Sequence, residues 1–156
     1  MLKVFIGFGG PDAKVVAEEV EKFLKVETKI ETFLASPRSN TLSPNVADFK
    51  ATINRELLDC NLAVFVCHKG TPRSTLVKNE IDMLYSQDLE NKIISFAASD
   101  NCLPKKLREQ HWHPLHFPPE KPEESFARLL NEIYRSYIEL KEPTRIISEN
   151  APMVRQ

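Results

Sequence analysis

The most apolar stretch of the chain is Leu62-Ala63-Val64-Phe65-Val66-Cys67. A continuous run of this length, rich in β-branched and aromatic residues, is typical of a strand that is buried on both faces of a parallel sheet. Residues 74–85, which follow it, have the apolar spacing of an amphipathic helix. The same helical spacing comes before it, at Val46, Phe49, Ile53 and Leu57.

This alternation of helix and strand extends outward in both directions. Further strands are predicted over residues 2–8, 30–34, 92–98 and, more weakly, 112–117, and further helices over residues 12–26, with Asp12 as cap, and 126–140. Strands that alternate with helices imply a parallel sheet with right-handed crossovers. We therefore predict an α/β fold, a three-layer flavodoxin-like sandwich with a central parallel sheet of about five strands and helices on both faces. One domain is expected over residues 1–140, followed by a tail or linker over residues 141–156.

The composition excludes several classes of partner. Lys+Arg 21 against Asp+Glu 22 gives a net charge of −1, so no global basic field attracts nucleic acid or an anionic membrane. The apolar runs are too short to cross a bilayer. The three cysteines form no even disulfide set, which favours a reducing, cytoplasmic location.

Glu80 interrupts the apolar pattern of its own helix. At about 100° per residue, the stripe formed by Leu76, Val77, Ile81, Met83 and Leu84 also includes Glu80. A carboxylate in an apolar environment either gains a partner or has its pKa raised, and such groups gather in functional clefts. This makes Glu80 the first catalytic candidate, although a carboxylate at the end of the stripe that reaches water or an arginine has the same pattern.

The expected ligand edge of the sheet lies next to this helix. Ligands of parallel sheets bind beyond the carboxyl ends of the strands, near a switch in strand order. The expected loops over residues 7–12, 35–44 and 67–74 meet at that edge, and Glu80 lies just beyond the third loop.

Several short motifs along the chain also match a known family. They are Val4-Phe5-Ile6-Gly7-Phe8 followed by Asp12, Phe33 before a long loop, residues 53–60 before the apolar strand, Ser74 six residues ahead of Glu80, Lys92-Ile93-Ile94, and Leu103-Pro104. In their order and spacing they resemble a TIR-like domain (Toll/interleukin-1 receptor type) over roughly residues 2–140. The resemblance implies self-association and a role in signalling or defence.

In enzymatic members of that family, a glutamate at the position of Glu80 is catalytic in cleaving the bond between nicotinamide and ribose in NAD+. The resemblance thus implies an NAD+ nucleosidase, with NAD+ as substrate and no cofactor, that yields nicotinamide and either ADP-ribose or a cyclic product. Such chemistry suits a carboxylate, because the oxocarbenium-like transition state carries positive charge. The NAD+-binding residues expected are Phe8, Gly9, Gly10, Arg38 and Ser74.

These binding residues have different expected roles. The turn at Gly9 and Gly10 would let the backbone approach the dinucleotide, and Arg38 would contact a phosphate. Ser74 is either a substrate contact or a helix cap, a role open to Thr71 as well. The chain also departs from the family pattern, with Leu76 where many active relatives have tryptophan and Gly7 where serine is common.

Other signals are weaker. The three histidines of residues 111–116 have no accompanying cysteine or carboxylate cluster, so no metal site is predicted. Cys67 and His68 are adjacent, so in a strand their side chains point to opposite faces and do not form a nucleophile and base. Residues 7–10 do not complete a dinucleotide-binding G-x-G-x-x-G fingerprint.

Two alternative functions remain open beside the NAD+ nucleosidase. One is a non-catalytic TIR-like module for self-association, in which Glu80 is replaceable. The other is an enzyme similar to the nucleoside deoxyribosyltransferases, which also combine a small parallel sheet with a nucleophilic glutamate and exchange bases on deoxynucleosides.

Overall fold

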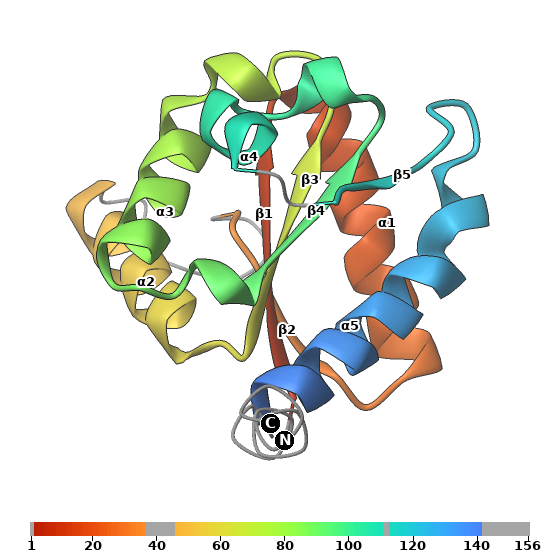
Figure 1. Ribbon diagram of the computed structural model, residues 1–156, viewed down its shortest axis with the longest axis horizontal. Helices are drawn as coiled ribbons and strands as arrows, with labels where there is room; N and C mark the ends of the chain where they lie inside the picture. The colour runs from red at the N-terminus through yellow and green to blue at the C-terminus, as the bar shows by residue number, and fades with distance from the viewer. Residues whose placement is uncertain (1, 37–45, 111–112, 142–156) are drawn as a thin grey trace, which may run out of the picture.

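The computed structural model describes residues 2–36, 46–110 and 113–141. In this part of the chain, strands alternate with helices as the sequence predicts (Figure 1). The strands are β1 (Lys3–Gly9), β2 (Glu31–Leu34), β3 (Leu62–Cys67), β4 (Ile93–Ala97) and β5 (Leu115–His116). The α-helices are α1 (Pro11–Glu27), α2 (Val46–Asp59), α3 (Thr75–Ser86), α4 (Lys105–Glu109) and α5 (Phe126–Lys141).

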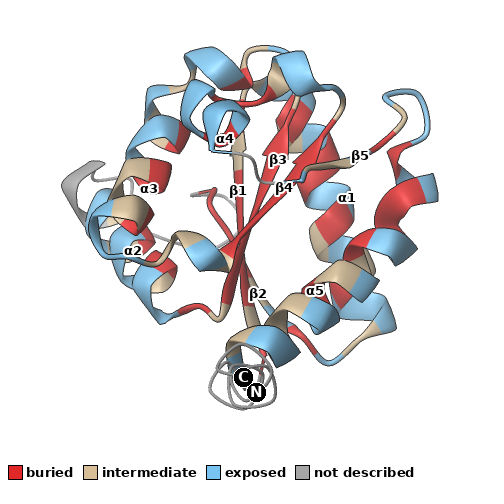
Figure 2. Cartoon of the chain, viewed as in Figure 1, coloured by how far each residue is buried: buried red, intermediate tan, exposed pale blue. Residues whose placement is uncertain are grey.

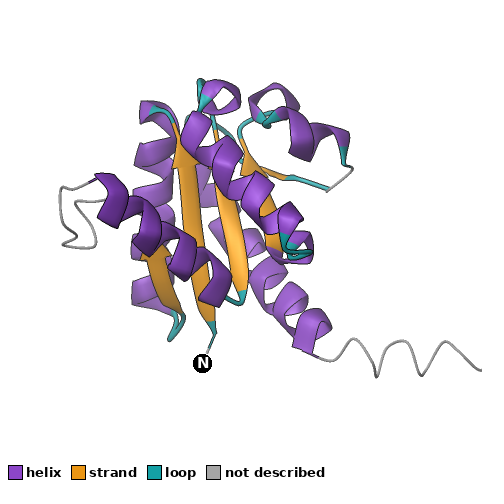
Figure 3. Ribbon diagram, turned by 90° about the vertical axis from the view of Figure 1, so that its left-hand side faces the viewer, coloured by secondary structure: helices purple, strands orange, loops and turns teal. Residues whose placement is uncertain are grey.

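The five strands form one parallel sheet in the order β2-β1-β3-β4-β5. The predicted α/β class is therefore confirmed, as a flavodoxin-like sandwich of three layers. Helices α1 and α5 cover one face of the sheet, and α2, α3 and α4 cover the other (Figures 1 and 3). The strand order changes direction between β1 and β3, which are paired directly.

The central strand β3 is buried along its whole length, as its composition predicts (Figure 2). Its side chains alternate between two separate cores. Leu62, Val64 and Val66 pack with α1 and α5, whereas Ala63 and Phe65 pack with α2, α3 and α4. The second core is the one that surrounds the catalytic candidate.

Three local predictions differ from the structure. Asp12 does not cap α1, because the helix begins at Pro11 with Gly10 as N-cap and no side-chain cap. Proline suits the first helical position, where no N–H is needed. The fifth strand is reduced to Leu115–His116, and the short helix α4 (Lys105–Glu109) lies between the fourth and fifth strands, where no helix was predicted.

Candidate functional site

Helix α3 positions Glu80 against the sheet. The helix begins after Ser74, whose Oγ accepts a hydrogen bond of 3.3 Å from the Val77 N–H. This confirms Ser74 as the N-cap, the structural role left open by the sequence. Val77 and Ile81 are buried on the same face as Glu80, and Glu80 is only 2 % exposed. The Glu80 side chain is therefore buried together with the apolar residues of this face of α3.

The Glu80 carboxyl group has no partner there. Neither Oε1 nor Oε2 has a hydrogen bond to any group in the described part of the chain. Burial raises the pKa of Glu80 from 4.5 to about 8. A buried polar group without a partner is costly, so its presence is a sign of a role other than stability. The group is mainly a neutral acid at pH 7, and a cation beside it would favour its ionised form.

Gly7 of β1 makes room for this carboxyl group. A Cβ atom at Gly7 would lie 2.7 and 2.8 Å from two ring atoms of Phe65, and 3.1 Å from Glu80 Oε1. Distances below 3.0 Å require something to shift, and the Phe65 ring is fully buried. The serine that is common here in TIR-like domains would therefore not fit this arrangement without movement of Phe65.

Glu80 lines a cavity of about 220 Å³ between α2 and α3. Both helices contribute residues at i, i+3 and i+4 spacing, which places each set on one helix face. Glu80 is a buried residue of this lining, with its Oε1 next to Gly7 of β1, whereas Lys50, Asn54 and Asn79 are exposed. The complete lining is Lys50, Ile53 and Asn54 of α2 and Leu76, Asn79, Glu80 and Met83 of α3.

The two turns at the carboxyl edge of β1 and β3 pack directly on each other. Thr71 Oγ1 donates a 2.6 Å hydrogen bond to the Gly9 carbonyl and accepts a 2.8 Å bond from the His68 N–H. A Cβ at Gly9 would lie 2.5 Å from Ser74 Cβ. Gly10 has φ 96°, and a Cβ there would lie 2.8 Å from the Lys69 carbonyl oxygen. Both glycines are thus accounted for by contact between the turns.

The predicted binding residues do not gather around Glu80. Phe8 packs with the α1 and α5 core, on the opposite face of β1 from Gly7. Gly9, Gly10 and Ser74 do not line the Glu80 cavity. Arg38 lies outside the described residues. The assignment of these residues to NAD+ binding stays a prediction.

Sequence reasoning missed Lys50, Asn54 and Asn79 as neighbours of Glu80. The only available signal was their spacing. Asn79 precedes Glu80, and Lys50 and Asn54 flank Ile53, a residue already expected to face the core. Which part of α2 faces α3 depends on how the two helices pack.

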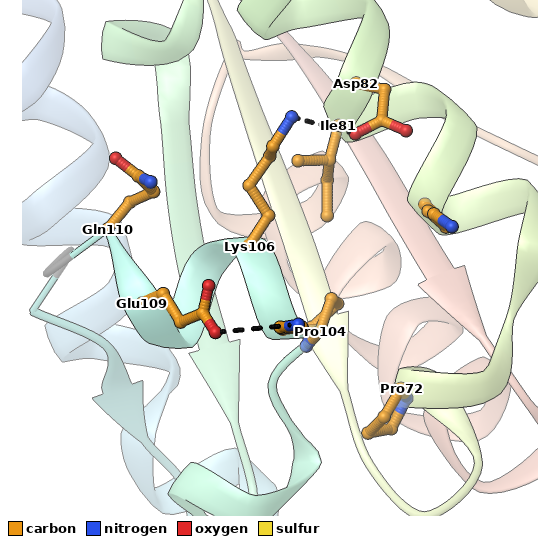
Figure 4. Close-up of a pocket in the computed structure, with 9 residues that line it drawn as sticks. Pro72, Ile81, Asp82, Pro104, Lys106, Glu109 and Gln110 are labelled. Atoms are coloured by element: carbon orange, nitrogen blue, oxygen red, sulfur yellow. Dashed lines mark hydrogen bonds and ion pairs between the residues drawn. The ribbon is translucent and has the colours of Figure 1, made fainter.

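A second, larger cavity lies on the other side of α3 (Figure 4). It has a volume of about 470 Å³ and lies between α3 and α4, with Ile81, Pro72 and Pro104 among its apolar residues. Both of its carboxylates are paired, since Asp82 lies 3.1 Å from Lys106 and Glu109 lies 4.0 Å from Lys105. The smaller cavity is the better candidate, because one of its lining residues, Glu80, has a buried carboxyl group without a partner in the described part of the chain.

The other possible sites have weaker geometry. His116 Nε2 lies 2.7 Å from Asp100 Oδ1, but both side chains are exposed. Burial raises the pKa of the Cys67 thiol, and His68 Nδ1 accepts a hydrogen bond from the Lys69 N–H. Within residues 2–36, 46–110 and 113–141, no group of three or more His, Cys, Asp or Glu side chains is placed to hold a metal ion.

No helix in the described part of the chain is both long enough and apolar enough to span a membrane. Neither the protein-family profiles nor the curated protein sequences that were searched contain a match to the chain.

Proposed function

We propose that the protein is an NAD+ nucleosidase of the TIR type that cleaves the bond between nicotinamide and ribose at Glu80. The observation that carries the proposal is the Glu80 carboxyl group, which is 2 % exposed, has no hydrogen-bond partner in the described part of the chain and lines a cavity. A carboxylate held in this way is suited to a cationic reacting centre. The resemblance to TIR-like domains supports the same position for the catalytic residue.

The reaction makes use of the raised pKa of Glu80. NAD+ has a positive charge on its nicotinamide ring, and binding it beside Glu80 favours the ionised carboxylate. The bond from ribose C1′ to the ring nitrogen then breaks, and nicotinamide leaves as a neutral molecule with the bonding electron pair. Positive charge develops on the ribose, where the carboxylate stabilises it. Addition of water, with loss of one proton, gives ADP-ribose, and attack by the adenine of the same molecule gives a cyclic product.

The test is nicotinamide release from NAD+ by concentrated protein, with a crowding agent to promote the self-association that we also propose for this chain. We expect Glu80→Gln to lower the rate at least about 100-fold, the range for loss of a group that stabilises charge in the transition state. Glu109→Gln is the matched control, because Glu109 is an exposed carboxylate outside the Glu80 cavity, and it should leave the rate unchanged. Equal release by the parent and Glu80→Gln would remove Glu80 from the chemistry.

A deoxyribosyltransferase is the second candidate, and the size of the cavity favours it. About 220 Å³ is below the roughly 300–1,000 Å³ of a site for a drug-sized ligand, which suits a nucleoside better than a whole dinucleotide. Base exchange between deoxynucleosides, lost in Glu80→Gln and without nicotinamide release from NAD+, would establish this function. If folded, self-associated protein has neither activity, a non-catalytic TIR-like signalling module becomes the better proposal.

We also propose a cytoplasmic location. All three cysteines, Cys60, Cys67 and Cys102, are free thiols, which suits a reducing compartment.

A further inference from the structure

Strand β4 is only partly covered at the edge of the sheet. Its neighbour β5 pairs with Phe96 and Ala97, the last two residues of β4. Residues 93–95 pair with β3 on one side and, in the described part of the chain, with no strand on the other. Such an edge is a template for a further strand, because a row of backbone N–H and C=O groups faces outward.

Two backbone groups of this edge are buried without a partner. The Phe117 N–H donates a 3.0 Å hydrogen bond to the Ala97 carbonyl, so Ala97 directs its backbone groups away from β3. By alternation along the strand, Ile93 and Ser95 do the same. Within residues 2–36, 46–110 and 113–141, no hydrogen bond reaches the Ile93 carbonyl or the Ser95 N–H. The two residues are only 5 % and 3 % exposed, and buried backbone groups are nearly always paired.

A groove runs along this open edge, between β4 and α5. It consists of two cavities of about 410 and 500 Å³ that share Asn91 and Leu140. Residues 93–95 line the first cavity, and Lys92 and Lys141 line the second. Neither cavity shares a lining residue with the Glu80 cavity, so an occupant of this groove does not depend on the proposed function.

The chain that follows α5 starts at this groove. Lys141 is the last residue of α5, and it lines the groove together with Lys92, which directly precedes β4. Residues 142–156 lie outside the described residues. Two residues after Lys141 comes the segment Thr144-Arg145-Ile146-Ile147-Ser148, whose β-branched residues favour a strand. A strand that starts beside Lys92 and follows β4 is parallel to it, like the other strand pairs of the sheet.

The charge of the groove also suits this segment. On α5, Glu132 and Glu139 share the single cation of Arg135, at 2.5 and 3.0 Å. This side of the groove therefore has one negative charge in excess. Residues 144–148 contain Arg145 and no acidic residue.

We propose that residues 144–148 bind in this groove as a further parallel strand, paired with residues 93–95 of β4. The Ile93 carbonyl and the Ser95 N–H then gain partners, and the open edge of the sheet is closed. The segment expected from the sequence to be a tail or linker thus completes the domain.

The test is amide hydrogen exchange of the full chain, resolved by NMR. The Ser95 N–H should be protected in the parent. It should exchange at least about 10-fold faster when Ile146→Asp and Ile147→Asp are combined, in line with the loss of one hydrogen bond. The Ile94 N–H faces β3, so its exchange should be the same in both proteins.

Met153→Asp combined with Val154→Asp is the matched control. These residues are also an adjacent apolar pair after α5, but they lie outside the proposed strand, so Ser95 should keep its protection. A nuclear Overhauser contact between the Ser95 N–H and residues 144–148 of the parent would support the pairing even if the Ile146 and Ile147 variant did not fold.

Three results would overturn the proposal. One is fast exchange of the Ser95 N–H in the parent, and another is an unchanged rate in the folded variant with both isoleucines replaced. The third is protection of Ser95 that rises with protein concentration, which would identify a second copy of the chain as the occupant of the groove.

Discussion

Thr71 and Glu80 are two polar residues with the same degree of burial and opposite surroundings. They lie nine positions apart in the connection from β3 through α3, and they are 1 % and 2 % exposed. The Thr71 hydroxyl donates one hydrogen bond and accepts another, and so joins the two turns at the carboxyl edge of the sheet. The Glu80 carboxyl has no such bond within the described part of the chain.

This difference in hydrogen bonding distinguishes a polar group that stabilises the fold, Thr71, from one that is a candidate for function, Glu80. A satisfied buried hydroxyl stabilises the fold, because the hydrogen bonds replace those lost to water. A buried carboxyl without partners destabilises it, and the cost is greatest when the group is ionised. Removing each group should therefore change stability in opposite directions.

The largest expected effect is the pH dependence that Glu80 adds to stability. Its pKa in the folded protein, about 8, lies above the value of about 4.5 in the unfolded chain, so the unfolded state loses the proton first. The fold is therefore most stable with respect to this group below pH 4.5, where the carboxyl is neutral in both states, and stability is lost as the pH rises through about 8. The loss amounts to about 5 kcal/mol.

Denaturant unfolding of the parent and Glu80→Met from pH 4.5 to pH 8.5 measures this effect. The stability of Glu80→Met relative to the parent should rise steadily across this interval, because methionine has no proton to lose. Glu109→Gln should follow the parent, since Glu109 is exposed. A difference between parent and Glu80→Met that does not vary with pH would mean that Glu80 is not held as a neutral acid.

The second effect has the opposite sign. Thr71→Val keeps the shape of the side chain and leaves the His68 N–H and the Gly9 carbonyl without their partner. We expect a loss of about 3 kcal/mol in the free energy of unfolding at all pH values, because one buried and one partly buried backbone group lose their side-chain partner. Thr71→Ser, which keeps the hydroxyl, should lose less than half as much. A loss in Thr71→Ser as large as that in Thr71→Val would contradict this, because it would show that the methyl group contributes as much as the hydrogen bonds.

The sequence predicted the fold well because the pattern of apolar residues reflects burial directly. The run from Leu62 to Cys67 is fully buried, and the expected parallel sheet follows from its alternation with helices. The burial of Glu80 was predictable on the same basis, since its apolar neighbours one turn away must face the core. Helix α4 was missed because five residues, of which only Leu107 is buried, do not show a helical period.

The surroundings of Glu80 were less predictable, because they depend on contacts between distant elements. Gly9 and Gly10 have the sequence of a ligand-binding turn, yet here they make room for Ser74 and the Lys69 carbonyl. Lys50 reaches the cavity only through the packing of α2 beside α3. A sequence shows which residues are buried more clearly than it shows which buried residues face each other.

The smallest of the three effects concerns Gly7, the residue that makes room for the Glu80 carboxyl. The methyl group of Gly7→Ala would lie within 3.0 Å of the Phe65 ring and 3.1 Å from Glu80 Oε1. We expect the overpacking to lower stability by about 2 kcal/mol at pH 5, where Glu80 is neutral. The carboxyl group should also move toward the cavity mouth, and its pKa should fall as it gains water.

A double-mutant cycle of Gly7→Ala with Glu80→Met, measured at pH 5 and pH 8, separates these two consequences. Strain against Phe65 alone gives the same loss at both pH values, whether or not Glu80 is present. Displacement of the carboxyl makes Gly7→Ala less harmful at pH 8 than at pH 5, and only when Glu80 is present. The second result would show that one missing Cβ atom on β1 controls the proton affinity of Glu80, and the first would restrict Gly7 to a packing role.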